Sequence, residues 1–207
     1  FAETITFEDA IGMTHLRGKL MQHSEEGKMM AILGIDSKTI DEACSQINES
    51  HKSAYVASAN YNSVKQTVIA GNIEGIEIAR DFLPEIGAKR CIELNVSIAS
   101  HTRLMTDAAN EFNESLQKIN FSAPRYPIIQ NYTGEIETDI STIKQNLFNQ
   151  LTKPVLWTKT MDKISQSASC LIEVGPKNIL CGLSKGYDLS SILYIADQDF
   201  KDKVQNI

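Results

Sequence analysis

The chain has 207 residues, which suffices for one large domain or two small ones with a core that needs no disulfide or metal. Hydrophobic residues make up 42% of it and charged residues 22%, a composition that argues against disorder, collagen and coiled coil. No apolar run approaches the ~18 residues of a membrane-spanning helix. The net charge of −6 lacks the basic excess of a nucleic-acid-binding protein. We therefore expect neither a membrane nor a nucleic acid as a partner.

The cysteines indicate a reducing compartment. None of the four belongs to a Cys-x-x-Cys pair, and each has apolar neighbours (Cys44, Cys91, Cys170, Cys181). We expect buried free thiols and a cytoplasmic protein, with no metal site. The chain begins with Phe1 and shows no signal peptide, so we expect its natural start to lie further upstream.

The first predicted element is a helix that begins after Thr6. Thr6 and Asp9 have the spacing of a capping box, and apolar residues follow with a period near 3.6 up to Gln22 (Phe7, Ala10, Met13, Leu20, Met21). The segment 24–27 ends this helix and predicts a joint between subdomains.

Residues 27–96 predict a compact module. Strands are expected at 29–33, 54–59, 67–70 and 90–94, with a loop at 60–65. Two helices lie between them: one is capped by Asp36 or Ser37, and the other is capped by Asn72 and stopped by Gly87. The order βαββαβ is that of a ferredoxin-like, split-βαβ subdomain.

Residues 97–207 return to strands that alternate with helices. Strands are expected at 127–130, 171–174 and 192–195, and helices after Ser100 and at 140–151, 158–165 and 178–185. Such alternation predicts an α/β fold with a largely parallel sheet. We therefore predict a discontinuous core, 1–26 with 97–207, interrupted by the small subdomain 27–96.

One segment matches the nucleophile pattern Gly-x-Ser-x-Gly, at Gly182, Ser184 and Gly186. A nucleophile elbow needs a strand directly before the serine, whereas Ser184 falls late in a predicted helix. We favour a helix C-terminus with Gly186 as the stop signal. A serine hydrolase that uses Ser184 remains an alternative.

Among four histidines, His101 has the most suggestive position. It follows Ser100 at a predicted helix start, where the helix N-terminus would keep the imidazole neutral, as a general base requires. A capping or packing role remains open for it. His15, His23 and His51 fall on predicted helix faces or in polar loops.

Several segments together resemble one family, in order and over essentially the whole chain. They are Leu16–Gln22, Ala59–Ser63, Gln66–Gly71, Gly87–Arg90, Ser100-His101 with Leu104-Met105, Asn149–Leu151, Pro154–Thr158 and Glu173–Pro176. The pattern resembles that of the malonyl-CoA:acyl carrier protein transacylases. The resemblance implies an α/β-hydrolase-like core interrupted by a ferredoxin-like subdomain.

The resemblance also implies site residues. His101 corresponds to the base, Arg17 to the anchor of the malonyl carboxylate, and Gln150 to the residue whose main-chain carbonyl orients the imidazole. Asn60, Asn62 and Gln66 correspond to polar residues that line the pocket. A guanidinium suits a carboxylate because it can bind both oxygens at once.

Three departures from the family pattern affect the interpretation. The family's Gly-His-Ser-x-Gly elbow is absent, so the nucleophilic serine is expected upstream of residue 1 and the chain alone is expected to be inactive. No proline precedes Ser100, which makes strict malonyl selectivity less secure. The basic pair expected after Leu183 is reduced to Lys185-Gly186.

We therefore predict a cytoplasmic, monomeric acyltransferase of fatty acid biosynthesis. It would transfer malonyl from malonyl-CoA to the phosphopantetheine thiol of acyl carrier protein, without metal or redox cofactor. Lys89 and Arg90 are adjacent basic residues in a net acidic chain, and we predict that they dock the carrier protein or CoA phosphates. The main alternative is a non-catalytic remnant that binds acyl-CoA or carrier protein only.

Overall fold

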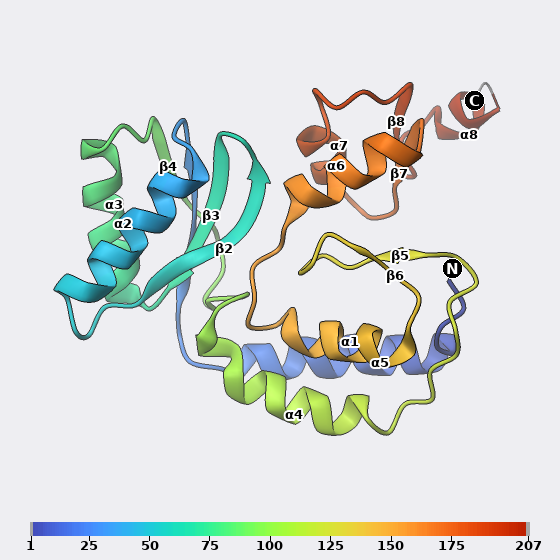
Figure 1. Ribbon diagram of the computed structural model, residues 1–207, viewed down its shortest axis with the longest axis horizontal. Coiled ribbons are helices and arrows are strands. Elements are labelled where there is room, and N and C mark those ends of the chain that lie inside the picture. The colour runs from blue at the N-terminus through green and yellow to red at the C-terminus, as the bar shows by residue number, and fades with distance from the viewer. Residues whose placement is uncertain (1, 206–207) are drawn as a thin grey trace. The chain divides into compact units, whose positions relative to one another are not determined.

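The structure, a computed structural model, describes residues 2–205 (Figure 1). The chain forms two compact units, residues 1–157 and 158–207. The first unit contains α1 (Phe7–Gln22), β1 (Lys28–Leu33), α2 (Ser37–Ser50), β2 (Val56–Ser63), β3 (Gln66–Gly71), α3 (Ile73–Glu85), β4 (Arg90–Glu93), the 3₁₀ helix η1 (Arg103–Met105), α4 (Thr106–Leu116), β5 (Ile128–Ile129), β6 (Ile136–Glu137) and α5 (Ile140–Asn149). The second contains α6 (Trp157–Ser167, which begins at the boundary), β7 (Cys170–Glu173), α7 (Ile179–Leu183), β8 (Ser191–Tyr194) and α8 (Phe200–Val204).

The small subdomain has the predicted βαββαβ order. Its four strands form one antiparallel sheet in the order β2-β3-β1-β4. Helices α2 and α3 cover one face of this sheet (Figure 1). Between helices and sheet lies an apolar core (Met30, Ile32, Ile40, Ala43, Cys44, Ile47, Ala54, Val56, Ile69, Ile76, Ala79 and Leu83). The split-βαβ prediction is confirmed.

The helix ends of this region follow from local chemistry. Each predicted N-cap side chain accepts a hydrogen bond from a main-chain N–H three residues on: Thr6 from Asp9, Asp36 from Thr39, and Asn72 from Gly75. Gly87 has a φ of +106°, and the Ala88 N–H donates to the Leu83 carbonyl at 3.0 Å, which closes α3 with a Schellman motif.

The second face of the small sheet carries a smaller apolar cluster. Met29, Ala31, Ala59, Val68 and Ala70 form it together with Ala99, and Leu104 packs against it. The segment that leads into η1 is therefore laid across this sheet. This packing fixes the chain on both sides of His101.

Three helices, α1, α4 and α5, share the remaining core of the first unit. Their buried cluster consists of Met21, Met105, Ala108, Ala109, Phe112, Leu116 and Leu151. The predicted inner face of α1 is wrong at its start, because Phe7 is 75% exposed. Periodicity identified the helix, but only its C-terminal half is buried by neighbours.

Two further predictions are corrected. Residues 60–63 belong to β2 and not to a loop, because they pair with β3 and because Tyr61 N–H donates to the Val155 carbonyl at 2.9 Å. The strand predicted at 127–130 shrinks to β5, which pairs antiparallel with β6 as a hairpin. Among the described residues, parallel pairing between strands occurs in one sheet, β7 with β8.

The second unit, described by itself, surrounds that parallel pair. The Glu173 carboxylate at the end of β7 accepts from the Cys181 N–H in α7 at 2.8 Å. Gly186 has a φ of +104° after α7, as the stop signal predicted. Over residues 2–205, no helix is long and apolar enough to cross a membrane.

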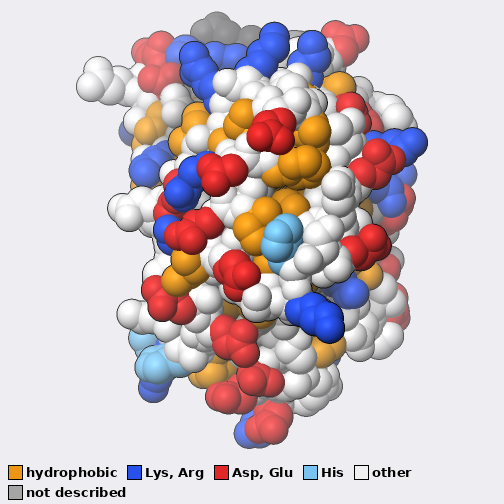
Figure 2. Space-filling model, turned by 90° about the vertical axis from the view of Figure 1, so that its left-hand side faces the viewer, with side chains coloured by type: hydrophobic (Ala, Val, Ile, Leu, Met, Phe, Trp, Pro, Cys, Tyr) orange, Lys and Arg blue, Asp and Glu red, His pale blue; other side chains and the backbone are white. Residues whose placement is uncertain are grey.

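The surface over the small subdomain mixes charges of both signs. Figure 2 shows acidic and basic side chains interspersed with apolar ones on the face that carries α2 and α3. All four cysteines are free thiols, but the expectation that all are buried is wrong: Cys44 is buried, whereas Cys91, Cys170 and Cys181 are partly exposed. Burial raises the pKa of Cys44 to about 12. That thiol is therefore a packing group of the core and not a nucleophile.

Candidate active site around His101

His101 occupies a turn in the left-handed region of the backbone, with a φ of +63°. This conformation costs a residue with a Cβ roughly 1–2 kcal/mol, so its surroundings must hold it. The buried Thr102 hydroxyl does so by donating to the Ala99 carbonyl at 2.7 Å. The same hydroxyl caps η1 by accepting from the Leu104 N–H. His101 thus precedes the helical segment and does not sit on its N-terminus, which corrects the sequence prediction.

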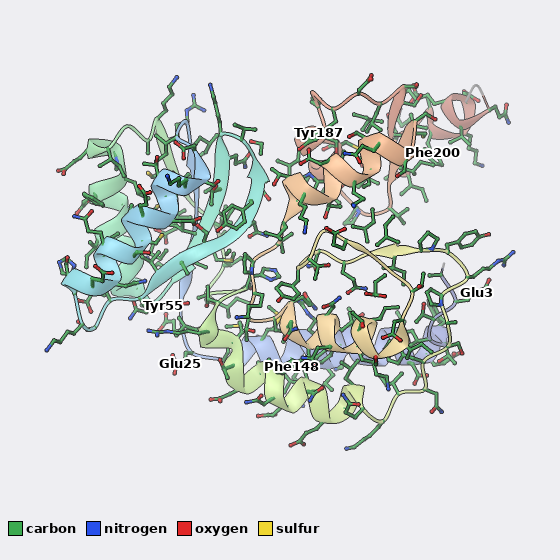
Figure 3. All side chains as sticks on the ribbon, in the orientation of Figure 1. Glu3, Glu25, Tyr55, Phe148, Tyr187 and Phe200 are labelled. Carbon is green, nitrogen blue, oxygen red and sulfur yellow. The ribbon has the colours of Figure 1, made fainter. Side chains whose placement is uncertain are left out.

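An aromatic contact also anchors this turn to the small subdomain. The guanidinium of Arg103 lies 3.9 Å from the centre of the Tyr55 ring, and Tyr55 is labelled in Figure 3. Cation–π contacts of this kind are worth ~0.5–1 kcal/mol at exposed sites. The two residues connect the segment directly before β2 to η1, two residues after His101.

Two consecutive carbonyls after α5 bind His101. Its main-chain N–H donates to the Leu151 carbonyl at 3.1 Å, and its ring Nδ1 lies 2.6 Å from the Gln150 carbonyl oxygen. A carbonyl oxygen only accepts hydrogen bonds, so Nδ1 carries the proton and Nε2 keeps a free lone pair. Leu151 is fully buried in the three-helix core, which makes this support rigid.

The environment of His101 favours its neutral form. Burial of the ring lowers its pKa first, and the positive charge of Arg17 lowers it further. The hydrogen bond from Nδ1 to the main-chain carbonyl of Gln150 raises the pKa and partly opposes these effects. An imidazole that is neutral at pH 7, with Nε2 free, is able to accept a proton from a hydroxyl or a thiol.

Arg17 lies on α1 and is half-buried. It contacts Gln150, the residue whose carbonyl also binds His101. Its Nη2 donates to the side-chain Oε1 of Gln150 at 3.2 Å. Its Nε is buried and has no hydrogen-bond partner among the described residues. Burial lowers the pKa of this guanidinium, although it remains protonated at any physiological pH. A cation in such a place is stabilised by an anion from outside the chain.

Gln150 therefore joins the imidazole of His101 and the guanidinium of Arg17. It is the C-cap of α5, its carbonyl binds the imidazole, and its side chain binds the guanidinium. The sequence resemblance assigned the carbonyl; the side-chain contact has no signal in the sequence. Thr102 was likewise missed, since a threonine at a turn is unremarkable without the Ala99 contact.

The three residues predicted to line the pocket lie on two neighbouring strands, β2 and β3. Asn60 lies on β2 at a parallel bridge to Val155, five residues after Gln150. Asn62 lies further along β2, and Gln66 opens β3 beside the hairpin turn. Within residues 2–205, the side chains of Asn60, Asn62 and Gln66 make no hydrogen bond to His101 or Arg17. Their role in a pocket stays a prediction.

Lys89 and Arg90 are both exposed at the start of β4. The methylene stem of Lys89 lies against Gly34, whose φ of +103° and missing Cβ leave room for it. Neither residue forms an ion pair within the described part of the chain. Their charges are thus available to an acidic partner, and the docking role stays a prediction.

Ser184 is unsuited to the hydrolase alternative. It is fully buried at the C-cap of α7, and its hydroxyl donates to the Leu180 carbonyl at 2.8 Å. A nucleophile must be exposed to substrate and must give its proton to a base. The helix-end interpretation accounts for this residue.

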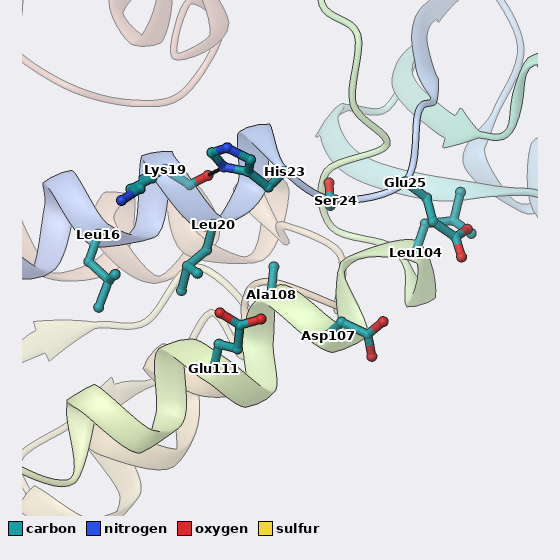
Figure 4. Close-up of a pocket in the computed structure, with 10 residues that line it drawn as sticks. All are labelled: Leu16, Lys19, Leu20, His23, Ser24, Glu25, Leu104, Asp107, Ala108 and Glu111. Carbon is teal, nitrogen blue, oxygen red and sulfur yellow. Dashed lines mark hydrogen bonds between the residues drawn. The ribbon is translucent and has the colours of Figure 1, made fainter.

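A pocket of about 480 Å³ opens between α1 and α4 (Figure 4), and Arg17 is not among the residues that line it. Its lining combines apolar residues (Leu16, Leu20, Leu104, Ala108) with polar and charged residues of both signs (Lys19, His23, Ser24, Glu25, Asp107, Glu111). The His23 ring is bonded to the Lys19 carbonyl at 2.7 Å. Neither His101 nor Gln150 lines this pocket, so the pocket is not the candidate active site.

Comparisons of the sequence with known proteins identify the relatives of this chain. No protein-family model matches the chain. The malonyl CoA-acyl carrier protein transacylase of Salmonella typhimurium is 42% identical over 188 residues, which are 89% of this chain and 60% of that protein. The transacylase of the same name from Bacillus subtilis is 34% identical over 188 residues, which are 89% of this chain and 59% of that protein. The chain thus spans about 60% of the length of these curated relatives.

Solved structures give the same result. The crystal structure of FabD from Acinetobacter baumannii superposes with a TM-score of 0.93 at 34% identity, over 99% of this chain and 66% of that one. A malonyl-transacylase solved in complex with a type II PKS acyl-carrier protein matches with a TM-score of 0.92 at 37% identity, over 100% of this chain and 68% of its own. The chain belongs to the malonyl-CoA:acyl carrier protein transacylase family.

Proposed function

We propose that the protein transfers a malonyl group from malonyl-CoA to the phosphopantetheine thiol of acyl carrier protein in fatty acid biosynthesis. The observation that carries the proposal is the meeting of His101 and Arg17 on Gln150. A proton acceptor and a carboxylate-binding cation are thereby placed side by side. These are the two groups that a malonyl thioester needs. The nucleophilic serine is proposed to come from sequence before Phe1.

In the first half-reaction, Nε2 of His101 takes the serine proton. The serine oxygen attacks the thioester carbonyl, the carbon–sulfur bond breaks, and CoA leaves with the proton returned by the imidazolium. The carbonyl of Gln150 keeps Nδ1 protonated throughout and stabilises the positive charge that forms on the ring. The product is a malonyl-serine ester.

In the second half-reaction, the same imidazole serves the incoming thiol. His101 takes the proton of the phosphopantetheine thiol, the sulfur attacks the ester, and the serine oxygen leaves with that proton. Each half-reaction needs only a positioned base and nucleophile. The proposal therefore uses no metal or redox cofactor.

Arg17 gives the proposal its substrate class. Its Nε and the remaining Nη protons face no other acceptor among the described residues, so a carboxylate can bind them in the bidentate geometry that guanidinium favours. Malonyl carries such a carboxylate and acetyl does not. Malonyl selectivity is thus proposed to reside chiefly in this residue.

The carrier protein and the location are further parts of the proposal. A family member with a TM-score of 0.92 to this chain was solved in complex with its acyl-carrier protein, which supports a carrier protein as the acceptor. Lys89 and Arg90 are proposed as part of its docking surface. Four unpaired cysteines support a cytoplasmic location.

The test is the acyl-enzyme burst of the extended protein, meaning this chain preceded by its serine segment. With labelled malonyl-CoA, the parent protein should show a burst and His101→Ala should lose it while retaining its fold. A burst of normal rate and size in His101→Ala would remove His101 from the mechanism. Binding of carrier protein without any burst in the parent would favour the non-catalytic alternative.

A further inference from the structure

Arg17 is a half-buried cation whose one side-chain hydrogen bond within residues 2–205 goes to a neutral group, the Oε1 of Gln150. We propose that the side chain of Gln150 is a placeholder: it holds the guanidinium in the free protein and gives way to the carboxylate of the substrate. This inference rests on the proposed function, because it assumes that Arg17 binds a carboxylate. It adds a positioning residue that sets how strongly that carboxylate is bound.

The contact is too weak to compete with a carboxylate. It is a single bond of 3.2 Å, it leaves the buried Nε without a partner, and its acceptor carries no charge. A carboxylate offers two charged oxygens, and hydrogen bonds with charge on both sides are about twice as strong as neutral ones. Arg17 forms no ion pair with an acidic side chain of the described chain, so nothing stronger than Gln150 must be displaced.

The type of residue at position 150 determines how strongly Arg17 can bind a carboxylate from outside the chain. A glutamate would pair with Arg17 internally and compete with the substrate through the same kind of bond. An apolar side chain would leave the cation without an acceptor in the free state, at a cost that ligand binding would relieve. The amide of glutamine lies between these extremes, because it satisfies one donor without neutralising the charge.

Displacement of the side chain leaves the base undisturbed. His101 is bound by the main-chain carbonyl of Gln150, and the next residue, Leu151, is fully buried and accepts from the His101 N–H. Rotation of the Gln150 side chain moves neither carbonyl. The carboxylate can therefore take over the guanidinium while Nε2 of His101 keeps its position.

The experiment measures binding of malonate to the 207-residue chain by calorimetry, with malonamide as the probe that lacks carboxylates. Gln150→Glu should weaken malonate binding by about tenfold or more, since an internal ion pair replaces a neutral contact. Gln150→Met should strengthen it several-fold. Gln145→Glu and Gln145→Met are the matched controls, because Gln145 is an exposed residue of α5 bonded to Asn149, and they should leave the affinity within about twofold of the parent.

A second readout follows Arg17 without any ligand. Hydrogen exchange of its guanidinium protons, measured by NMR, should speed up in Gln150→Met and slow down in Gln150→Glu relative to the controls. A general loss of structure would change malonate affinity in the same direction in Gln150→Met and Gln150→Glu, and likewise the exchange rate. Changes of opposite direction in the two variants, in both measurements, are therefore not expected from it. Their observation would support the placeholder.

The failures can be told apart. Malonate affinity that stays the same in both Gln150 variants, or falls equally in both, would overturn the placeholder while the carboxylate anchor stands. Absence of malonate binding in the parent chain would overturn the anchor, and with it the displacement step. In that case the proposed function loses its substrate argument as well.

Discussion

Replacing Arg17 with alanine should remove the proposed preference for malonyl over acetyl groups in the extended protein. The guanidinium is half-buried, bonded once to a neutral amide and otherwise without an acceptor among the described residues. The malonyl carboxylate would supply the anion that this cation lacks. Acetyl has nothing to offer it, so the two substrates respond differently to the loss of the side chain.

The size of the effect follows from the donors that are available. Nε and a second guanidinium N–H can bind the two carboxylate oxygens, and a hydrogen bond to a charged group is worth about 1.5–3 kcal/mol. Two such bonds, less the contact to Gln150 that is given up, leave roughly 2–4 kcal/mol. At about 1.4 kcal/mol per factor of ten, kcat/KM for malonyl-CoA should fall by roughly 30- to 1,000-fold.

The assay compares both substrates in the same variant. Transfer from labelled malonyl-CoA and acetyl-CoA to carrier protein gives two values of kcat/KM, and the acetyl value should change by less than about threefold. Arg17→Lys is an informative companion, because an ammonium keeps the charge but cannot bind two oxygens in the same plane. An equal fall for both substrates in Arg17→Ala would show that Arg17 is structural and would refute the reasoning.

Further predictions concern other parts of the molecule. Arg17→Ala, or saturating malonate, should raise the pKa of His101 because each removes a positive charge that holds it down; an unchanged NMR titration would contradict this. Ser184→Ala should leave transfer nearly unchanged, and a large loss in a folded variant would restore the hydrolase alternative. Charge reversal of Lys89 and Arg90 should slow carrier-protein association at low salt, and equal rates would exclude them from docking. Phe112→Ala should lower the free energy of unfolding by about 3–5 kcal/mol in urea titrations, since the ring is 1% exposed.

Local chemistry explains why much of the fold could be predicted. The caps Thr6, Asp36 and Asn72 act within three residues of the helices they start, and Gly87 ends α3 through its own positive φ. Such signals survive in a single sequence because they need no distant partner. Together with the apolar runs of the strands, they predicted the βαββαβ order.

The wrong predictions concern residues whose conformation or burial depends on partners that are distant in the sequence. Residues 60–63 are polar and read as a loop, yet β3 on one side and Val155 on the other make them a strand. Phe7 satisfies the helical period but finds no neighbour to cover it. The left-handed turn of His101 depends on carbonyls 49 and 50 residues away, which no local pattern reveals.

The link between β2 and Val155 also bears on self-association. An outer strand presents unpaired N–H and carbonyl groups on which another chain can add a strand and begin aggregation. At the middle of β2 these groups are already taken, since Tyr61 N–H donates to Val155 and Val155 N–H donates to the Ala59 carbonyl at 2.8 Å. The opposite edge is the short β4, whose Glu93 is paired with Lys28. The middle of the β2 edge is thus closed to strand addition by a second copy, and the segment that closes it follows directly on the residues that support the imidazole.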